Sequence, residues 1–358
     1  MKRRESIYIA GPECFYSGGF DQLNAMRRFA EVNGFDVSLP NDTPLKLDHE
    51  DLRKNADVIF ENCAQSMNQS TAILCDLEFY RGPEADGGSI YELGMAYARG
   101  IRCYGYTRDK REMKWKYQGL TLKDGLPYDR KGRVLPYWDL PFSPNVVGST
   151  KIIEGGFADC LKLFQIDLEE ERKRGEIPAE PASNEKRTMH PPTIYLSGPE
   201  RYDANAQERY AGMRRLCEAH GFSVITPMDA IEQQQMEDPY ARAAQTLRRN
   251  AEHVRACDIL IANLNDFHGW EPESDTSFEC GMAFQLGKRL YGYMDSTLRM
   301  RDRVPSLGEA NGWRDICGCN VENFDYPLNL MFASSMPVLE GTFEQVIEKI
   351  AGDIQLEA

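Results

Sequence analysis

The sequence lacks any long hydrophobic run, since no stretch of apolar residues approaches the roughly 20 that a transmembrane helix needs. The first residues, MKRRESIYIAGPE, are basic, but no apolar segment of signal-peptide length follows them. This pattern predicts a cytoplasmic protein that neither spans a membrane nor acts at its surface.

Metal-binding residues are also few or poorly spaced. The five histidines lie apart from one another and from the ten cysteines. Only Cys317 and Cys319 are close together, and no second pair completes a zinc site. We therefore expect reduced thiols, no metal, no cofactor and no histidine-based catalytic triad.

Positive charge is in deficit, with 42 Lys and Arg against 56 Asp and Glu and a net charge of −14. Such a balance disfavours a nucleic-acid polyanion as the partner but is compatible with a neutral nucleoside or a free base. A chain of 358 residues is too long for one average core and predicts two domains.

The most informative feature is an internal repeat. IYIAGPE (7–13) matches IYLSGPE (194–200), and ELGMAYARGIRCYGY (92–106) matches ECGMAFQLGKRLYGY (279–293) at the same offset. Matches this dense without gaps indicate duplication of a whole domain. We predict unit 1 at 1–168, a charged, Pro-rich linker at 169–192 and unit 2 at 193–358.

Each unit alternates predicted strands and helices. In unit 1, SIYIAG, FDVSLP and TAILCDL have strand character, apolar residues recur at helical spacing over 20–33, and a second helix is predicted over 90–99. This order predicts a doubly wound parallel sheet, whose ligands bind beyond the carboxyl ends of the strands.

One glutamate per unit occupies the same place at the start of the second of these helices. Ser89 to Glu92 and Thr276 to Glu279 both fit the capping-box pattern, which by itself accounts for the glutamates. A functional interpretation rests on the position past a strand end, on the neighbouring Asp86, and on the helix dipole, which favours an ionised Glu92.

The stretch FYRGPEADGGSIYELGMAYARG (79–100) closely resembles the signature of the nucleoside 2-deoxyribosyltransferase family. The opening IYIAGPE and the tripeptide Asn329-Leu330-Met331 resemble two further motifs of that family. The resemblance covers both units and implies flavodoxin-like folds that form an internal pseudo-dimer. It also implies transfer of a 2-deoxyribosyl group between purine or pyrimidine bases.

By this resemblance Glu92 is the nucleophile that attacks C1′ and forms a covalent deoxyribosyl-enzyme, with overall retention. Tyr8 orients its carboxylate and Asp86 binds the 5′-hydroxyl. The proton donor to the leaving base is left open, because the positions where many members carry Asp or Asn hold Cys63 and Asn250. The substrate-binding positions carried over from the motifs are Gly11, Gly88, Ser89, Asn329 and Met331.

The second copy departs from the pattern. Asp275 replaces a glycine and adds like charge beside Glu279, which should raise the pKa of that glutamate and crowd the sugar. We therefore expect a weakened second site, whose residues are Glu279, Tyr195, Glu273 and Asn145.

Two other functions fit the same residues. Water in place of the acceptor base would make the protein an N-glycosidase acting on nucleosides or their monophosphates, and a non-catalytic nucleoside sensor would use both glutamates only as caps. The sequence leaves open which bases are used and whether the chain forms a further homo-oligomer. The poorly matched stretches 41–60 and 107–140 are the predicted base-binding loops.

Overall fold

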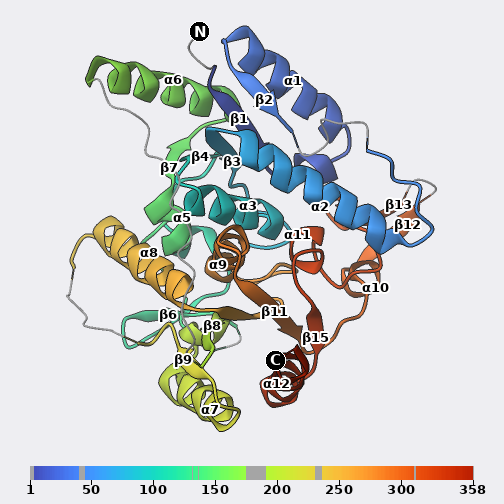
Figure 1. The fold of residues 1–358 in the computed structure, drawn as a ribbon. Coiled ribbons are helices and arrows are strands. Elements are labelled where there is room, and N and C mark those ends of the chain that lie inside the picture. The colour runs from blue at the N-terminus through green and yellow to red at the C-terminus, as the bar shows by residue number, and fades with distance from the viewer. Residues whose placement is uncertain are drawn as a thin grey trace.

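The computed structural model describes residues 4–39, 45–130, 132–135, 137–174, 191–229, 236–309 and 312–357. Within these residues the chain folds into two α/β units, each built on a five-stranded sheet (Figure 1). Both sheets are parallel throughout.

The strand order is the same in the two units. Unit 1 has the order β2-β1-β3-β4-β7, with β1 at Ser6–Ala10, β2 at Asp36–Ser38, β3 at Ala72–Asp76, β4 at Arg102–Thr107 and β7 at Lys151–Glu154. Unit 2 has the order β9-β8-β10-β11-β15, with β8 at Thr193–Ser197, β9 at Ser223–Ile225, β10 at Ile259–Asn263, β11 at Arg289–Met294 and β15 at Val338–Glu340. This is the flavodoxin-like order, which confirms the predicted tandem doubly wound units.

Helices cover both faces of each sheet. The outer faces carry α1 (Gly19–Val32) and α6 (Phe157–Arg174) in unit 1, and α7 (Ala206–Ala219) and α12 (Phe343–Glu357) in unit 2. The inner faces carry α2 (Leu52–Gln69), α3 (Gly87–Ala98), α8 (Pro239–Ala256) and α9 (Ser274–Gln285). The inner helices of both units share one continuous hydrophobic core, so the chain is an internal pseudo-dimer, with its layers stacked in Figure 1 from α1 to α12.

Short elements complete the units. They are η1 (Pro12–Phe15), α4 (Met113–Lys116), β5 (Thr121–Lys123), β6 (Leu126–Tyr128), α5 (Pro144–Ser149), η2 (Pro199–Tyr202), α10 (Met300–Arg303), β12 (Ser306–Glu309), β13 (Gly312–Asp315), β14 (Asn320–Val321) and α11 (Leu330–Ala333). Helix α11 of unit 2 packs on α2 of unit 1, and α5 of unit 1 packs on α8 of unit 2. Each unit therefore delivers a short helix to the inner face of the other.

Two glycines let α3 and α9 cross in close contact. A Cβ atom on Gly94 would lie 2.0 Å from the Phe278 carbonyl oxygen, and one on Gly281 would lie 1.8 Å from the Tyr91 carbonyl oxygen. These obstacles are backbone atoms, which cannot turn aside as a side chain can.

We therefore expect Gly94→Ala to lower the free energy of unfolding by about 1–3 kcal/mol, because the two helices must separate to admit the methyl group. Gly352→Ala is the matched control, since Gly352 lies within α12 with no atom near its Cβ position. That change should leave stability unchanged or raise it by about 0.5–1 kcal/mol. Equal denaturation midpoints for the two variants would contradict this packing.

The predicted linker begins later than expected, because α6 continues to Arg174. The rest of the proposed tether, 175–190, lies outside the described residues.

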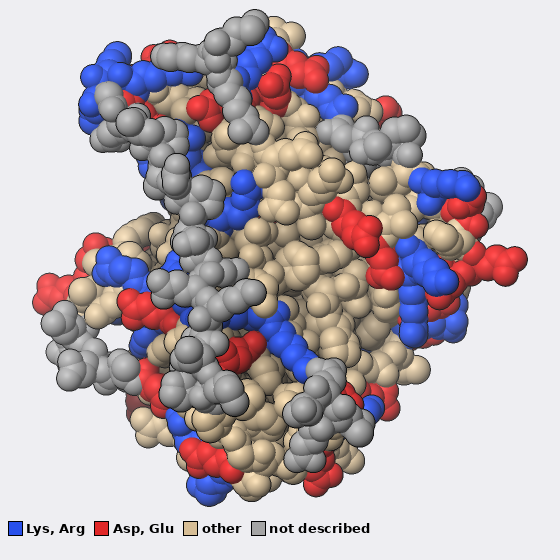
Figure 2. Space-filling view, viewed as in Figure 1, with Lys and Arg blue, Asp and Glu red and all other residues tan. Residues whose placement is uncertain are grey.

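None of the helices in the described part of the chain combines the length and apolarity needed to cross a membrane. Figure 2 shows acidic and basic side chains interspersed around the rim of one face, with a largely uncharged area near its centre.

Candidate active site

The first turn of α3 is capped by Asp86, not by a capping box that includes Glu92. The Asp86 Oδ2 atom accepts hydrogen bonds from the Ser89 backbone N–H at 2.8 Å and from the Ser89 hydroxyl at 2.6 Å. The helix begins at Gly87, earlier than the sequence indicated, so Glu92 lies beyond the first turn. Unit 2 repeats the arrangement with Glu273 as the cap of α9. The prediction that the repeated glutamates are caps is therefore wrong.

Glu92 instead lies against the first strand. Its Oε1 atom accepts a short hydrogen bond from the hydroxyl of Tyr8, which comes from β1 and is fully buried. Burial raises the pKa of Glu92 to about 8, against the opposing effect of the Tyr8 hydrogen bond, and the Asp86 charge raises it further. The expectation that the helix dipole keeps this group ionised is wrong, because desolvation outweighs the dipole.

Glu92 opens onto a cavity of about 300 Å³ that both units line. Unit 1 contributes residues of η1, α1, α2 and α3, and unit 2 contributes the segments 320–324 and 329–331. Of the residues predicted from the motifs, the cavity lining includes Gly11, Asp86, Gly88, Ser89, Glu92, Asn329 and Met331.

Asp86 and Asn329 meet in this cavity from different units. The Asp86 Oδ1 atom is buried and has no hydrogen-bond partner among the described residues, so it is available to a ligand hydroxyl. The Asn329 side chain accepts from the Met331 backbone N–H at 2.9 Å, which caps α11. A Cβ atom on Gly88 would lie 2.7 Å from the Asn329 amide nitrogen, so this position must be glycine for Asn329 to lie there.

Sequence reasoning missed the segment 320–324, which contributes Glu322 and Phe324 to the cavity. It also placed a base-binding loop within 107–140, but the described residues of that stretch do not line this cavity. The pseudo-dimer explains the error, because each unit sends its variable segment toward the other. The sequence did contain a signal for this segment. Residues 320–324 come shortly before Asn329, which was already expected to reach into the site of unit 1.

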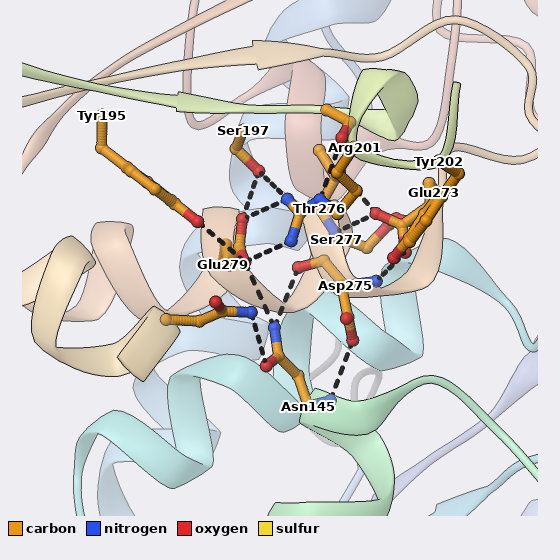
Figure 3. Close-up of polar contacts among 12 residues, drawn as sticks. Asn145, Tyr195, Ser197, Arg201, Tyr202, Glu273, Asp275, Thr276, Ser277 and Glu279 are labelled. Carbon is orange, nitrogen blue, oxygen red and sulfur yellow. Dashed lines mark hydrogen bonds and ion pairs between the residues drawn. The ribbon is translucent and has the colours of Figure 1, made fainter. Parts of the chain in front are cut away.

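The second cleft has a different interior (Figure 3). Arg201 of η2 donates to Glu279 from both of its terminal nitrogens, at 3.0 and 2.8 Å, and the two side chains are 6% and 1% exposed. Ser197 makes a short hydrogen bond to the same carboxylate, Tyr195 donates to it at 3.2 Å, and the Asn145 amide reaches it at 3.4 Å. Glu279 is thus engaged by protein groups on several sides.

This arrangement overturns the expected effect of Asp275 on Glu279. The pKa of Glu279 is lowered, because the nearby Arg201 charge and the hydrogen bonds from Arg201, Ser197 and Tyr195 outweigh the cost of burial. It is the pKa of Asp275 itself that burial raises, together with the charge of Glu273. No motif indicated that Arg201, which follows the repeated Gly-Pro-Glu, would turn inward.

Asp275 stands at the position that Gly88 holds in unit 1, where the Asn329 side chain lies against the helix. It is fully buried, and its Oδ1 atom accepts from the Asn145 backbone N–H at 2.9 Å. The Asn145 side chain in turn accepts from Asn250 at 3.1 Å. The first cleft therefore holds a buried Glu92 carboxyl group that lines a cavity. The second holds the Glu279 carboxylate, whose charge is neutralised by Arg201.

Within the described ranges, no group of three or more His, Cys, Asp or Glu could hold a metal ion.

Comparison with known proteins gives a consistent result. A model of the nucleoside 2-deoxyribosyltransferase family matches residues 7–135 and 194–331, one segment in each unit. No curated protein matches the chain.

Three solved structures illustrate the similarity. A 2-desoxiribosyltransferase from Leishmania mexicana is 30% identical, covering 44% of this chain and 98% of that one, with a TM-score of 0.36. A 2-deoxyribosyltransferase from Bacillus psychrosaccharolyticus is 19% identical, covering 28% and 71%, with a TM-score of 0.23. A conserved protein from Enterococcus faecalis V583 is 16% identical, covering 46% and 99%, with a TM-score of 0.29.

Proposed function

Since the chain belongs to the nucleoside 2-deoxyribosyltransferase family, we propose that it transfers a 2-deoxyribosyl group from one nucleobase to another at the cavity that holds Glu92. The observation that carries the proposal is the buried Glu92 carboxyl group, hydrogen-bonded by Tyr8 and open to a cavity that also holds the unpartnered Asp86 Oδ1 atom.

In this proposal the Glu92 carboxylate attacks C1′ of the deoxynucleoside and displaces the base. The resulting ester is then attacked by a second base from the face that the first one left, so the two displacements give retention. The lack of a 2′-hydroxyl eases the build-up of positive charge at C1′. Tyr8 orients the attacking oxygen, and its raised pKa keeps it a hydrogen-bond donor throughout the pH range of the reaction.

We assign turnover to unit 1 alone. Glu279 in unit 2 is held by Arg201 in a buried ion pair, and attack at C1′ would break that pair without replacing it. Asp275 adds a buried carboxyl group at the position where unit 1 has Gly88. Unit 2 then serves the reaction by supplying Asn329, Met331 and the segment 320–324 to the working cavity.

The direct test is incubation with a deoxynucleoside and a different free base, followed by chromatography. A new deoxynucleoside is the expected product. Release of base and deoxyribose alone would show an N-glycosidase, and an unchanged mixture would favour a non-catalytic sensor.

Because Asn329 of unit 2 lines the cavity that holds Glu92, we expect Asn329→Ala to reduce kcat/KM about 10- to 100-fold. This is the effect of losing one hydrogen bond to a group that is charged, or becomes charged in the transition state. The substitution also removes the α11 cap, at about 1 kcal/mol of stability. Asn145→Ala is the matched control, because Asn145 occupies the corresponding place in the second cleft. Equal losses of activity in both variants would argue against a single working cavity.

The position of the Asp86 carboxyl group predicts that the protein distinguishes a substrate with a 5′-hydroxyl from one with a 5′-phosphate. If Asp86 binds the 5′-hydroxyl, a phosphate there brings about two negative charges toward the carboxylate. Each pair of unit charges at roughly 4 Å costs about 4 kcal/mol at an effective dielectric constant near 20. We therefore expect deoxyadenosine to have a kcat/KM at least about 100-fold above that of its 5′-monophosphate.

Asp86→Ser separates this charge effect from folding, because serine is also a good N-cap. The variant should have a lower kcat/KM on deoxyadenosine. The ratio of kcat/KM between deoxyadenosine and its 5′-monophosphate should also be smaller than in the unmodified protein. A preference of the unmodified protein for the monophosphate would place the 5′ end elsewhere.

A further inference from the structure

The proposed transfer needs a proton for the departing base, because a neutral base leaves far more easily than an anion. The ionisable side chains that line the described part of the cavity are Cys14, Cys63, Asp86, Glu92 and Glu322. Burial raises the pKa of both cysteine thiols, which makes them poor acids. Asp86 caps α3 and Glu92 is the nucleophile, so Glu322 is the acid whose role is unassigned.

Glu322 follows β14 of unit 2 and lines the cavity together with residues of α3. Its Oε1 atom accepts from the Leu330 backbone N–H at 3.4 Å. Its Oε2 atom is buried and has no hydrogen-bond partner among the described residues. The charge of Glu322 also raises the pKa of Cys14 and of Cys63, so the group lies near both thiols that line the cavity.

Unit 1 holds this segment in place. The Arg81 guanidinium donates to the Asn320 carbonyl at 2.7 Å and to Asp315 at 3.0 Å, which holds the two strands of the β13–β14 hairpin where they flank its turn. Farther along, Arg53 donates to the Asp325 carbonyl at 3.3 Å. These contacts hold the segment of Glu322 at the wall of the cavity that Glu92 also lines, which is where a general acid for the leaving base must lie.

Resting on the proposed transfer, we propose that Glu322 is the general acid of the working cavity: its carboxyl group protonates the leaving base and its carboxylate takes a proton back from the incoming one. No residue of unit 1 in the described cavity lining can take this role, so the reaction would require the fused second unit.

A Glu92 oxygen forms a bond to C1′ while the C1′–N bond breaks, and the electron pair of that bond passes to the base. Glu322 gives its proton to a ring nitrogen of the base, which leaves neutral. In the second half the acceptor nitrogen attacks C1′, the Glu92 ester bond breaks with its electron pair returning to the carboxylate, and the acceptor's proton goes to Glu322.

The protonation state of Glu322 suits the role. Burial raises its pKa to about 8; the Arg81 charge acts in the opposite direction and the Asp86 charge adds to the rise. The titratable or charged groups that face it are Tyr80 and Arg81 after β3, Asp86 at the start of α3, Glu271 before α9, Cys14 of η1 and Cys63 of α2. Glu322 is therefore largely protonated at neutral pH.

The test compares two donors with hypoxanthine as acceptor, which differs from the base of either donor. 2′-Deoxyadenosine needs a proton on its base to leave, whereas 7-methyl-2′-deoxyguanosine already carries a positive base and needs none. We expect Glu322→Gln, which keeps the contact with Leu330, to lower kcat/KM about 10²- to 10⁴-fold on deoxyadenosine and less than about tenfold on the methylated donor. Rates are corrected for spontaneous loss of 7-methylguanine.

Glu271→Gln is the matched control. Glu271 is another glutamate of unit 2 near Arg81 and Asp86, with a pKa that burial also raises to about 8, but it does not line the cavity. Its variant should show the same ratio between the two donors as the unmodified protein. Equal losses on both donors in Glu322→Gln would overturn the proposal and make Glu322 a sugar-binding or structural residue.

The pH profile gives an independent readout. With deoxyadenosine, kcat/KM should rise as Glu92 ionises and fall as Glu322 loses its proton, and only the fall should disappear in Glu322→Gln. A fall that persists unchanged would overturn the proposal even if the protein ignores the methylated donor. Absence of transfer in the unmodified protein would instead refute the proposed function, so the two failures are distinguishable.

Discussion

Glu92→Gln is expected to reduce deoxyribosyl transfer by roughly 10³- to 10⁶-fold, the range seen when a covalent nucleophile is removed. The amide has nearly the same shape and still accepts a hydrogen bond from Tyr8, whose contact with Glu92 is the main one the carboxylate makes. Because Glu92 is not the cap of α3, the start of the helix at Asp86 is untouched.

Stability should not fall in this variant. Glu92 has a pKa of about 8, so it is mostly a neutral acid in the folded protein at neutral pH, and glutamine is neutral at every pH. The unmodified protein loses stability as the pH rises from the ordinary range of glutamate through about 8, because only the folded state holds the proton. Glu92→Gln should remove that part of the loss. Ordinary turnover in this variant would refute the nucleophile assignment.

Glu279→Gln is expected to have the opposite effect: activity is kept, while the free energy of unfolding falls by about 3 kcal/mol or more. The change removes the negative charge that compensates Arg201, whose side chain is 6% exposed. An uncompensated buried guanidinium is costly because it has lost both its hydration and its counter-ion. Chemical denaturation of the two glutamine variants side by side measures the contrast.

The double variant Arg201→Met/Glu279→Gln provides the control. Removing both members of a buried ion pair is often neutral, since no unpaired charge is left. We therefore expect it to recover most of the stability lost in Glu279→Gln. A double variant as unstable as the single one would mean that Glu279 supports the fold by some route other than Arg201. A loss of transfer in Glu279→Gln beyond what instability explains would show that unit 2 also works.

The fold could be predicted because the repeat made the same pattern visible twice. The strands at TAILCDL and DILIANL are buried on both faces, so their apolar character is continuous and easily recognised. The pairing of the units could be predicted only through the tripeptide at Asn329. The close crossing of α3 and α9 at Gly94 and Gly281 has no sequence signal beyond two small residues.

The site was predictable where motifs are local and not where side chains converge from distant segments. Glu92, Asp86 and Gly88 lie within one short stretch, so their spacing placed them in one cavity. Glu322 and Arg201 are ordinary charged residues in sequence. Their roles depend on burial and on which unit they face, so the low pKa of Glu279 could not be foreseen.

The central claim is that only the cavity containing Glu92 forms a covalent intermediate. The direct measurement is mass spectrometry of the acid-quenched protein after brief incubation with deoxyadenosine and no acceptor base, followed by peptide mapping. We expect a mass increase of one 2-deoxyribosyl group on the peptide that contains Glu92 and none on the peptide that contains Glu279. A label on the Glu279 peptide, or turnover with no label on Glu92 at any quench time, would contradict the account.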